Sequence, residues 1–88
     1  MQYSYFVGTS RGKKKNKPDE EWFSINILRE NRYQSIEVKP LFVTSEERFN
    51  ALCKKCPAIG TPVQVIMNLD NEPEEIKVLE DVPPLELY

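Results

Sequence analysis

Apolar and polar residues alternate along most of this chain with a period of two, the pattern of strands that bury one face. The clearest case runs from Trp22 to Leu28, where the apolar Phe23, Ile25 and Ile27 occupy alternate positions. Similar β-forming runs precede and follow it. We therefore expect five strands, at Gln2 to Val7, Trp22 to Leu28, Tyr33 to Val38, Pro62 to Leu69 and Glu75 to Val82.

Two features of this pattern leave alternatives open. Gly8 should end the first strand, and Pro40 should end the third strand or mark an edge or bulge. Alternation does not say which face of the first strand is buried. If Phe6 points inward, Tyr3 and Tyr5 form an outward platform for stacking; if Val7 points inward, both tyrosines belong to the core.

A short helix interrupts the strands. Thr44 followed by Glu47 forms a capping box, which predicts a helix from Ser45 to about Lys54. Within it, Phe49, Leu52 and Cys53 have the i, i+3, i+4 spacing of one apolar helix face.

Three strands, a helix and two strands follow the order of the OB-fold, a small Greek-key barrel. We predict a mostly β protein, a small five-stranded OB-like barrel with one short helix between strands 3 and 4. An SH3-like barrel and an open α+β sheet are the alternatives. With 88 residues and 40% hydrophobic content, the chain supports one core. We assign residues 1–82 to this domain and 83–88 to an acidic, partly apolar tail.

Charge is distributed unevenly. Residues 1–69 carry eleven Lys and Arg against seven Asp and Glu, whereas residues 70–88 carry one against seven. A basic cluster lies in the predicted loop between the first two strands and consists of Arg11, Lys13, Lys14, Lys15 and Lys17. Such a cluster predicts an anionic ligand, while the acidic segment after residue 69 should repel phosphate.

Several segments resemble the helix-destabilising, single-stranded DNA-binding proteins of filamentous phages and related mobile elements. They are the early strand, the basic loop leading into an aromatic strand (GKKKNKPDEEWFSINIL), and the late G-x-P-V-x-V-x-M followed by a turn and I-x-V-L-E-D-V. The resemblance implies a cytoplasmic, commonly dimeric protein that coats single-stranded DNA during replication or transfer. The residues themselves leave the oligomeric state open, although the apolar strand Val63 to Leu69 could face a second copy.

Single-strand binding requires cations for phosphates and aromatic faces for bases. Beside the five cations of the basic cluster, Arg29, Arg32 and Lys39 could extend a cationic path along strands two and three. Trp22 is the best candidate for stacking, and Tyr33 is the second. These ten residues form the predicted nucleic-acid-binding site, for DNA or RNA.

The remaining chemistry is sparse. The chain has no histidine, and Cys53 and Cys56 are its only cysteines, so neither an acid–base catalyst nor a complete zinc site is evident. We expect a protein that is not an enzyme and that needs no metal or cofactor. No apolar run approaches the roughly 18 residues of a membrane span, which predicts a soluble protein without membrane contact. The alternative function is that of an interaction or assembly subunit whose tail, ending in Tyr88, binds a protein partner.

Overall fold

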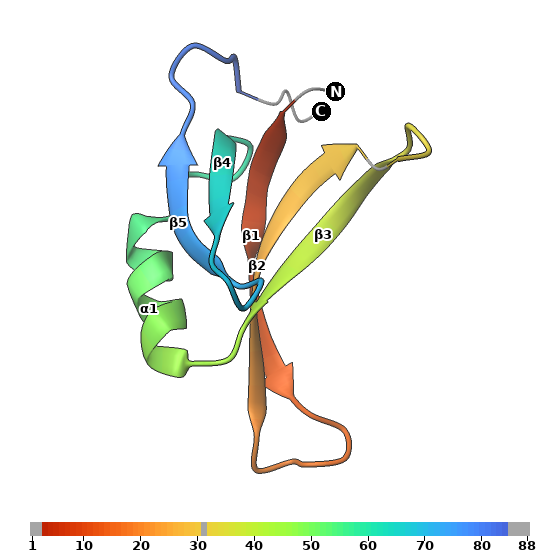
Figure 1. Ribbon diagram of the computed structural model, residues 1–88, viewed down its shortest axis with the longest axis vertical. Helices are drawn as coiled ribbons and strands as arrows, with labels where there is room; N and C mark the ends of the chain where they lie inside the picture. Colours follow the sequence, from red (N-terminus) through yellow and green to blue (C-terminus); the bar gives the residue numbers. More distant parts are fainter. Residues whose placement is uncertain (1–2, 31, 85–88) are drawn as a thin grey trace.

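The computed structural model describes residues 3–30 and 32–84. It contains one antiparallel sheet with the strand order β3-β2-β1-β4-β5. The elements, shown in Figure 1, are β1 (Ser4–Lys13), β2 (Glu21–Glu30), β3 (Ile36–Val43), α1 (Glu46–Lys55), β4 (Pro62–Met67) and β5 (Pro73–Val78). The predicted mostly β architecture, with its helix between the third and fourth strands, is confirmed.

The sheet is not closed into a barrel. Its edges are β3 and β5, and pairing them would complete the predicted closure. In the described part of the chain these two strands form no ladder, and they diverge in Figure 1. Pro40 lies in the middle of β3 and has no amide hydrogen to donate to a neighbouring strand. A cavity lined partly by Arg29 and Lys39 occupies the remaining gap.

β1 is longer than predicted. Gly8 does not end it, because a bulge between Phe6 and Gly8 accommodates the positive φ of 126° at Gly8 and pairing with β2 continues to Lys13. Arg11 and Lys13 therefore belong to a strand, and the loop between the strands is shortened to residues 14–20. The β1–β2 hairpin projects beyond the other elements, which gives the molecule a longest extent of 41 Å.

β3 also extends further than predicted, through Pro40 to Val43. Proline is tolerated there because β3 is an edge strand. The predicted alternation of Ile36 and Val38 is present, but both side chains are exposed. The inward residues of β3 come later, at the half-buried Leu41 and the buried Val43.

The core lies between the inner face of the sheet and α1. Its buried side chains are Phe6, Phe23, Ile25, Ile27, Val43, Phe49, Leu52, Val63 and Ile76. Phe23 of β2 packs on Phe49 of α1, with ring centroids 5.0 Å apart. β4 lies between β1 and β5 and Val63 belongs to the core, and the expectation that this strand faces a second copy stays a prediction.

The helix begins one residue later than predicted. Ser45, not Thr44, is the N-cap, and its hydroxyl accepts a hydrogen bond from the amide of Arg48 at 3.3 Å. Thr44 instead bonds to Glu72 across the gap between β3 and β5, which explains why the predicted capping box does not form.

Candidate nucleic-acid interface

The outer face of β1, β2 and β3, opposite the core, carries an aromatic depression. Alternation in β2 places Trp22, Ser24 and Asn26 on this face. The register brings Gly12 and Ser10 of β1 beside them on one side, and Phe42 and Pro40 of β3 on the other. The depression measures about 450 Å³ and is lined by Ser10, Trp22, Ser24, Asn26, Pro40 and Phe42.

Trp22 owes its position to Gly12. A Cβ at Gly12 would lie 2.7 Å from Cζ2 of the indole, so the ring packs directly on the backbone of β1. The ring of Phe42 lies edge-on to it, with centroids 6.1 Å apart and an interplanar angle of 82°. Phe42 is 54% exposed. Two aromatic rings at right angles therefore line an open surface, where a flat ligand could stack on one and touch the other.

The floor of the depression is polar. Ser24 is only 1% exposed, although it lies on the outer side of the sheet. Its hydroxyl donates to Oδ1 of Asn26 at 2.9 Å, and Nδ2 of Asn26 donates to Oγ of Ser10 at 2.9 Å. These bonds satisfy polar groups that the aromatic rings partly shield from water.

The structure shows which face of β1 is buried. Phe6 is 5% exposed and belongs to the core, whereas Tyr5 lies opposite Leu28 on the outer side. Tyr5 is half-buried, and Tyr3, two residues earlier, is exposed. This is the alternative in which the two tyrosines are available for stacking, and it extends the aromatic surface along β1.

Four of the predicted cations lie at the hairpin tip, beyond Trp22. Lys14 Nζ lies 2.9 Å from a carboxylate oxygen of Glu20, and Lys17 Nζ lies 4.0 Å from the other. Lys13 and Lys15 are exposed and form no ion pair with the described residues. With Asp19, residues 13–20 carry two carboxylates against four lysines, so the tip stays cationic.

Arg11 lies elsewhere. Its guanidinium is 5.0 Å from the ring centroid of Phe23, on the core side of the hairpin. It donates to Glu21 at 2.7 Å and reaches Glu46, at the start of α1, at 3.4 Å. The hydrogen bond that Arg11 donates to Glu21 is the main cause of the raised pKa of Arg11. Arg11 therefore connects the hairpin to the helix rather than facing the aromatic depression.

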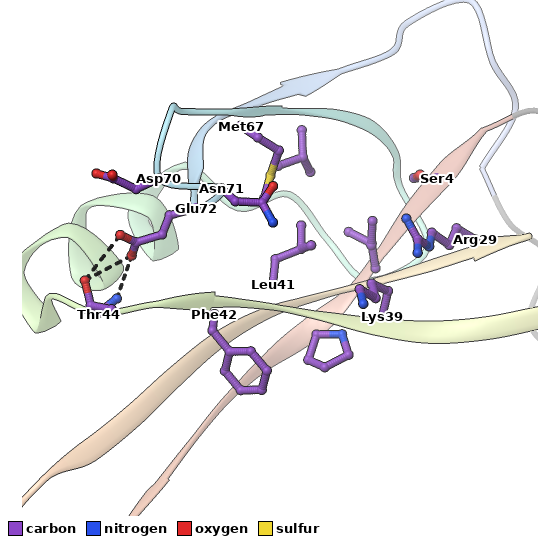
Figure 2. Close-up of a pocket in the computed structure, with 13 residues that line it drawn as sticks. Ser4, Arg29, Lys39, Leu41, Phe42, Thr44, Met67, Asp70, Asn71 and Glu72 are labelled. Carbon is purple, nitrogen blue, oxygen red and sulfur yellow. Dashed lines mark hydrogen bonds between the residues drawn. The ribbon is translucent and has the colours of Figure 1, made fainter. Parts of the chain in front are cut away.

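Arg29 and Lys39 also lie apart from Trp22. Both line a cavity of about 780 Å³ between β3 and the β4–β5 turn (Figure 2). Lys39 is paired with Ile27, a core residue, and Arg29 Nε lies 3.6 Å from a carboxylate oxygen of Glu37. Figure 2 shows Leu41 and Phe42 on opposite sides of β3, so this cavity and the aromatic depression open on different faces, and their linings share only Pro40 and Phe42 of this edge strand.

Arg32 and Tyr33 occupy the β2–β3 turn, at the opposite end of these strands from the lysine tip. The guanidinium of Arg32 lies 5.0 Å from the ring centroid of Tyr33, which is 72% exposed. The ten predicted residues thus fall into separate groups, and only the lysines of the tip lie next to Trp22.

Sequence reasoning missed the other residues of the depression. Continuing the alternation of β3 through Pro40 groups Phe42 with Ile36 and Val38, and the register with β2 then shows that this is also the face of Trp22. Gly12 and the polar floor carry no comparable signal, because their role depends on the pairing between strands.

The acidic β4–β5 turn has a structural contact. Glu72 accepts hydrogen bonds from the amide of Thr44 at 2.7 Å and from its hydroxyl at 3.1 Å. The bond from the Thr44 amide is the main cause of a lowered pKa of Glu72. This carboxylate holds the β4–β5 turn to the end of β3, as the dashed lines in Figure 2 show.

The thiol of Cys56 has little thiolate character. Cys53 and Cys56 are free and half-buried. Burial, with a smaller contribution from Cys53, raises the pKa of Cys56 to about 11. Among residues 3–30 and 32–84, no cluster of His, Cys, Asp or Glu is placed to hold a metal ion.

The chain matches no protein-family model, no curated protein and no solved structure. Within the described residues, no helix has the length and apolar character to cross a membrane.

Proposed function

We propose that this protein is a non-catalytic, single-stranded DNA-binding protein of low sequence specificity. The observation that carries the proposal is the outward pair Trp22 and Phe42 beside a lysine-rich hairpin tip. Aromatic rings stack on any base, and cations follow the phosphate chain without reading sequence. The β2–β3 face next to the first loop is also the surface that OB-folds use for oligonucleotides.

The proposed path begins at the hairpin tip. Phosphates contact the lysines of the tip, Lys13, Lys14, Lys15 and Lys17. The DNA strand then crosses the outer face of β2, where its bases stack on Trp22 and Phe42. Tyr5 offers a further ring along β1. Arg11 is left out of this path because it packs on Phe23 and reaches Glu46 of α1, and Arg29 and Lys39 are left out because they line the cavity on the core side of the sheet.

The resemblance to the helix-destabilising proteins of filamentous phages and mobile elements supports a role in replicating or transferring such DNA. A cytoplasmic location follows from that role. The absence of histidine supports binding rather than catalysis.

Salt dependence distinguishes the two kinds of contact. Changing Lys13, Lys14 and Lys15 to Ala should lower affinity for a single-stranded oligonucleotide and reduce the slope of log affinity against log salt by about 2. Trp22→Ala should cost about 1 to 3 kcal/mol of binding free energy and leave the slope nearly unchanged. Anisotropy titrations with a labelled oligonucleotide at several salt concentrations measure both quantities.

A matched control has the same change in net charge. Lys54, Lys55 and Lys77 are exposed on α1 and β5, away from the hairpin, so their replacement by Ala should leave the salt slope in place. Equal effects of the two triple variants would mean that binding reflects non-specific attraction to the overall charge and not contacts at the hairpin. Unchanged affinity in both the hairpin variant and Trp22→Ala would refute the proposed site.

A further inference from the structure

The floor of the aromatic depression is more specific than stacking alone requires. A floor made only of apolar side chains would support the same rings, yet a buried serine and a half-buried asparagine lie beneath them. The two bonds from Ser24 through Asn26 to Ser10 run in one direction, with each group donating to the next. This arrangement leaves one hydroxyl hydrogen of the floor available to a ligand.

The last member of this chain is the hydroxyl of Ser10. Its oxygen accepts from Asn26, and no acceptor among the described residues takes its hydrogen. Ser10 lines the depression, so this hydrogen can be donated to a bound molecule. A hydroxyl whose oxygen already accepts a bond is also a better donor, because hydrogen bonds in a chain polarise one another.

The walls limit what can use this donor. The indole of Trp22, the ring of Phe42 and the pyrrolidine of Pro40 surround the polar floor. The two aromatic planes are nearly perpendicular, so a flat ring that stacks on one meets the edge of the other. Such a site takes one planar ring with an acceptor on its edge.

We propose that the depression binds a single nucleobase and favours one with a carbonyl oxygen opposite its sugar, as in thymine, uracil or guanine. This inference rests on the proposed function. A base tethered to a phosphate chain outside the depression inserts the edge that is remote from its sugar. Thymine presents there the O4 acceptor for the Ser10 hydrogen, whereas cytosine presents the N4 amino donor, which leaves that hydrogen without an acceptor at this position of the base.

The test compares oligo(dT) with oligo(dC), since both bases have one ring and differ in this group. Titrations of the full chain at one salt concentration, followed by Trp22 fluorescence and by anisotropy, should show about three- to tenfold tighter binding of oligo(dT), the effect of one neutral hydrogen bond. Ser10→Ala should bring the ratio close to one, mainly by weakening oligo(dT) binding.

Two variants separate hydrogen bonding from misfolding. Ser10→Thr keeps the hydroxyl and should retain the preference, and Thr9→Ala removes a neighbouring exposed hydroxyl on the opposite face of β1 and should leave the ratio unchanged. Equal binding of both oligonucleotides by the unmodified protein, or a preference that survives Ser10→Ala, would overturn the base-selective site while single-strand binding stands. Failure to bind either oligonucleotide would refute the proposed function as well.

Discussion

Gly12 determines where the one tryptophan of the chain lies. The indole packs on the backbone of β1 at a distance that leaves no room for a Cβ, so any side chain at position 12 displaces the ring. The contact between Trp22 and Phe42 depends on this placement, because Phe42 lies opposite Ser24, two residues along β2 from Trp22.

Gly12→Ala should therefore move the indole away from β1 without unfolding the protein. We expect a red-shifted Trp22 emission and weaker single-strand binding, within the range of about 1 to 3 kcal/mol associated with one stacked base. Gly8→Ala is the matched control. Nothing lies near a Cβ at Gly8, but its φ of 126° is strained for alanine, so this variant should lower stability and leave the emission unchanged. An unchanged emission in Gly12→Ala would contradict this view of the site.

At the scale of single elements, the β1–β2 hairpin shows which features the sequence determines. The alternation of Phe23, Ile25 and Ile27 predicts the buried face of β2 correctly, because successive side chains of a strand point to opposite faces whichever strand is paired with it. The length of β1 was not predictable in this way. A glycine that usually ends a strand is accommodated here by a bulge, and a bulge is a property of two paired strands.

The same limit applies to the cations. Arg11 belongs to the basic cluster by sequence, but its partners are Phe23, Glu21 and Glu46, and the last is 35 positions away. Positions in the cluster have different roles because Arg11 lies within β1, over Phe23 and within reach of α1, whereas Lys13 ends β1 and the other lysines lie in the loop beyond it. Sequence predicted a cationic hairpin next to an aromatic strand, but the contacts that distinguish Arg11 from the lysines depend on how the hairpin packs against α1.

This separation predicts opposite phenotypes for Arg11→Ala and Lys15→Ala. Loss of Arg11 removes the contacts between the hairpin and α1, so the midpoint of urea unfolding should fall while the salt slope of binding stays the same. Loss of Lys15 should leave unfolding unaltered and reduce the salt slope by about 0.7, the value for one phosphate contact on a single strand. The reverse pattern would place Arg11 in the interface.

At the scale of the whole molecule, the gap between β3 and β5 is the main departure from the predicted barrel. Near the β4–β5 turn the gap is bridged by Glu72, which bonds to Thr44 and lies 3.6 Å from Nη1 of Arg48. Sequence could not reveal this contact, since Thr44 and Glu72 are 28 positions apart and Thr44 alone has the features of a helix cap. The negatively charged β4–β5 turn therefore also stabilises the fold.

This contact makes stability depend on pH in a definite direction. Because the pKa of Glu72 is lowered in the folded protein, its stabilising effect is complete above the unfolded pKa of roughly 4.3 and is lost as pH falls through the lower folded value. Glu72→Gln should therefore be less stable than the unmodified protein at pH 7, and this difference should shrink toward pH 3. Urea unfolding midpoints at pH 7, 5, 4 and 3 measure it. Glu74→Gln, an exposed neighbour, should keep the unmodified pH dependence. A difference that stays constant across this range would mean that the Thr44 contact does not depend on the charge of Glu72.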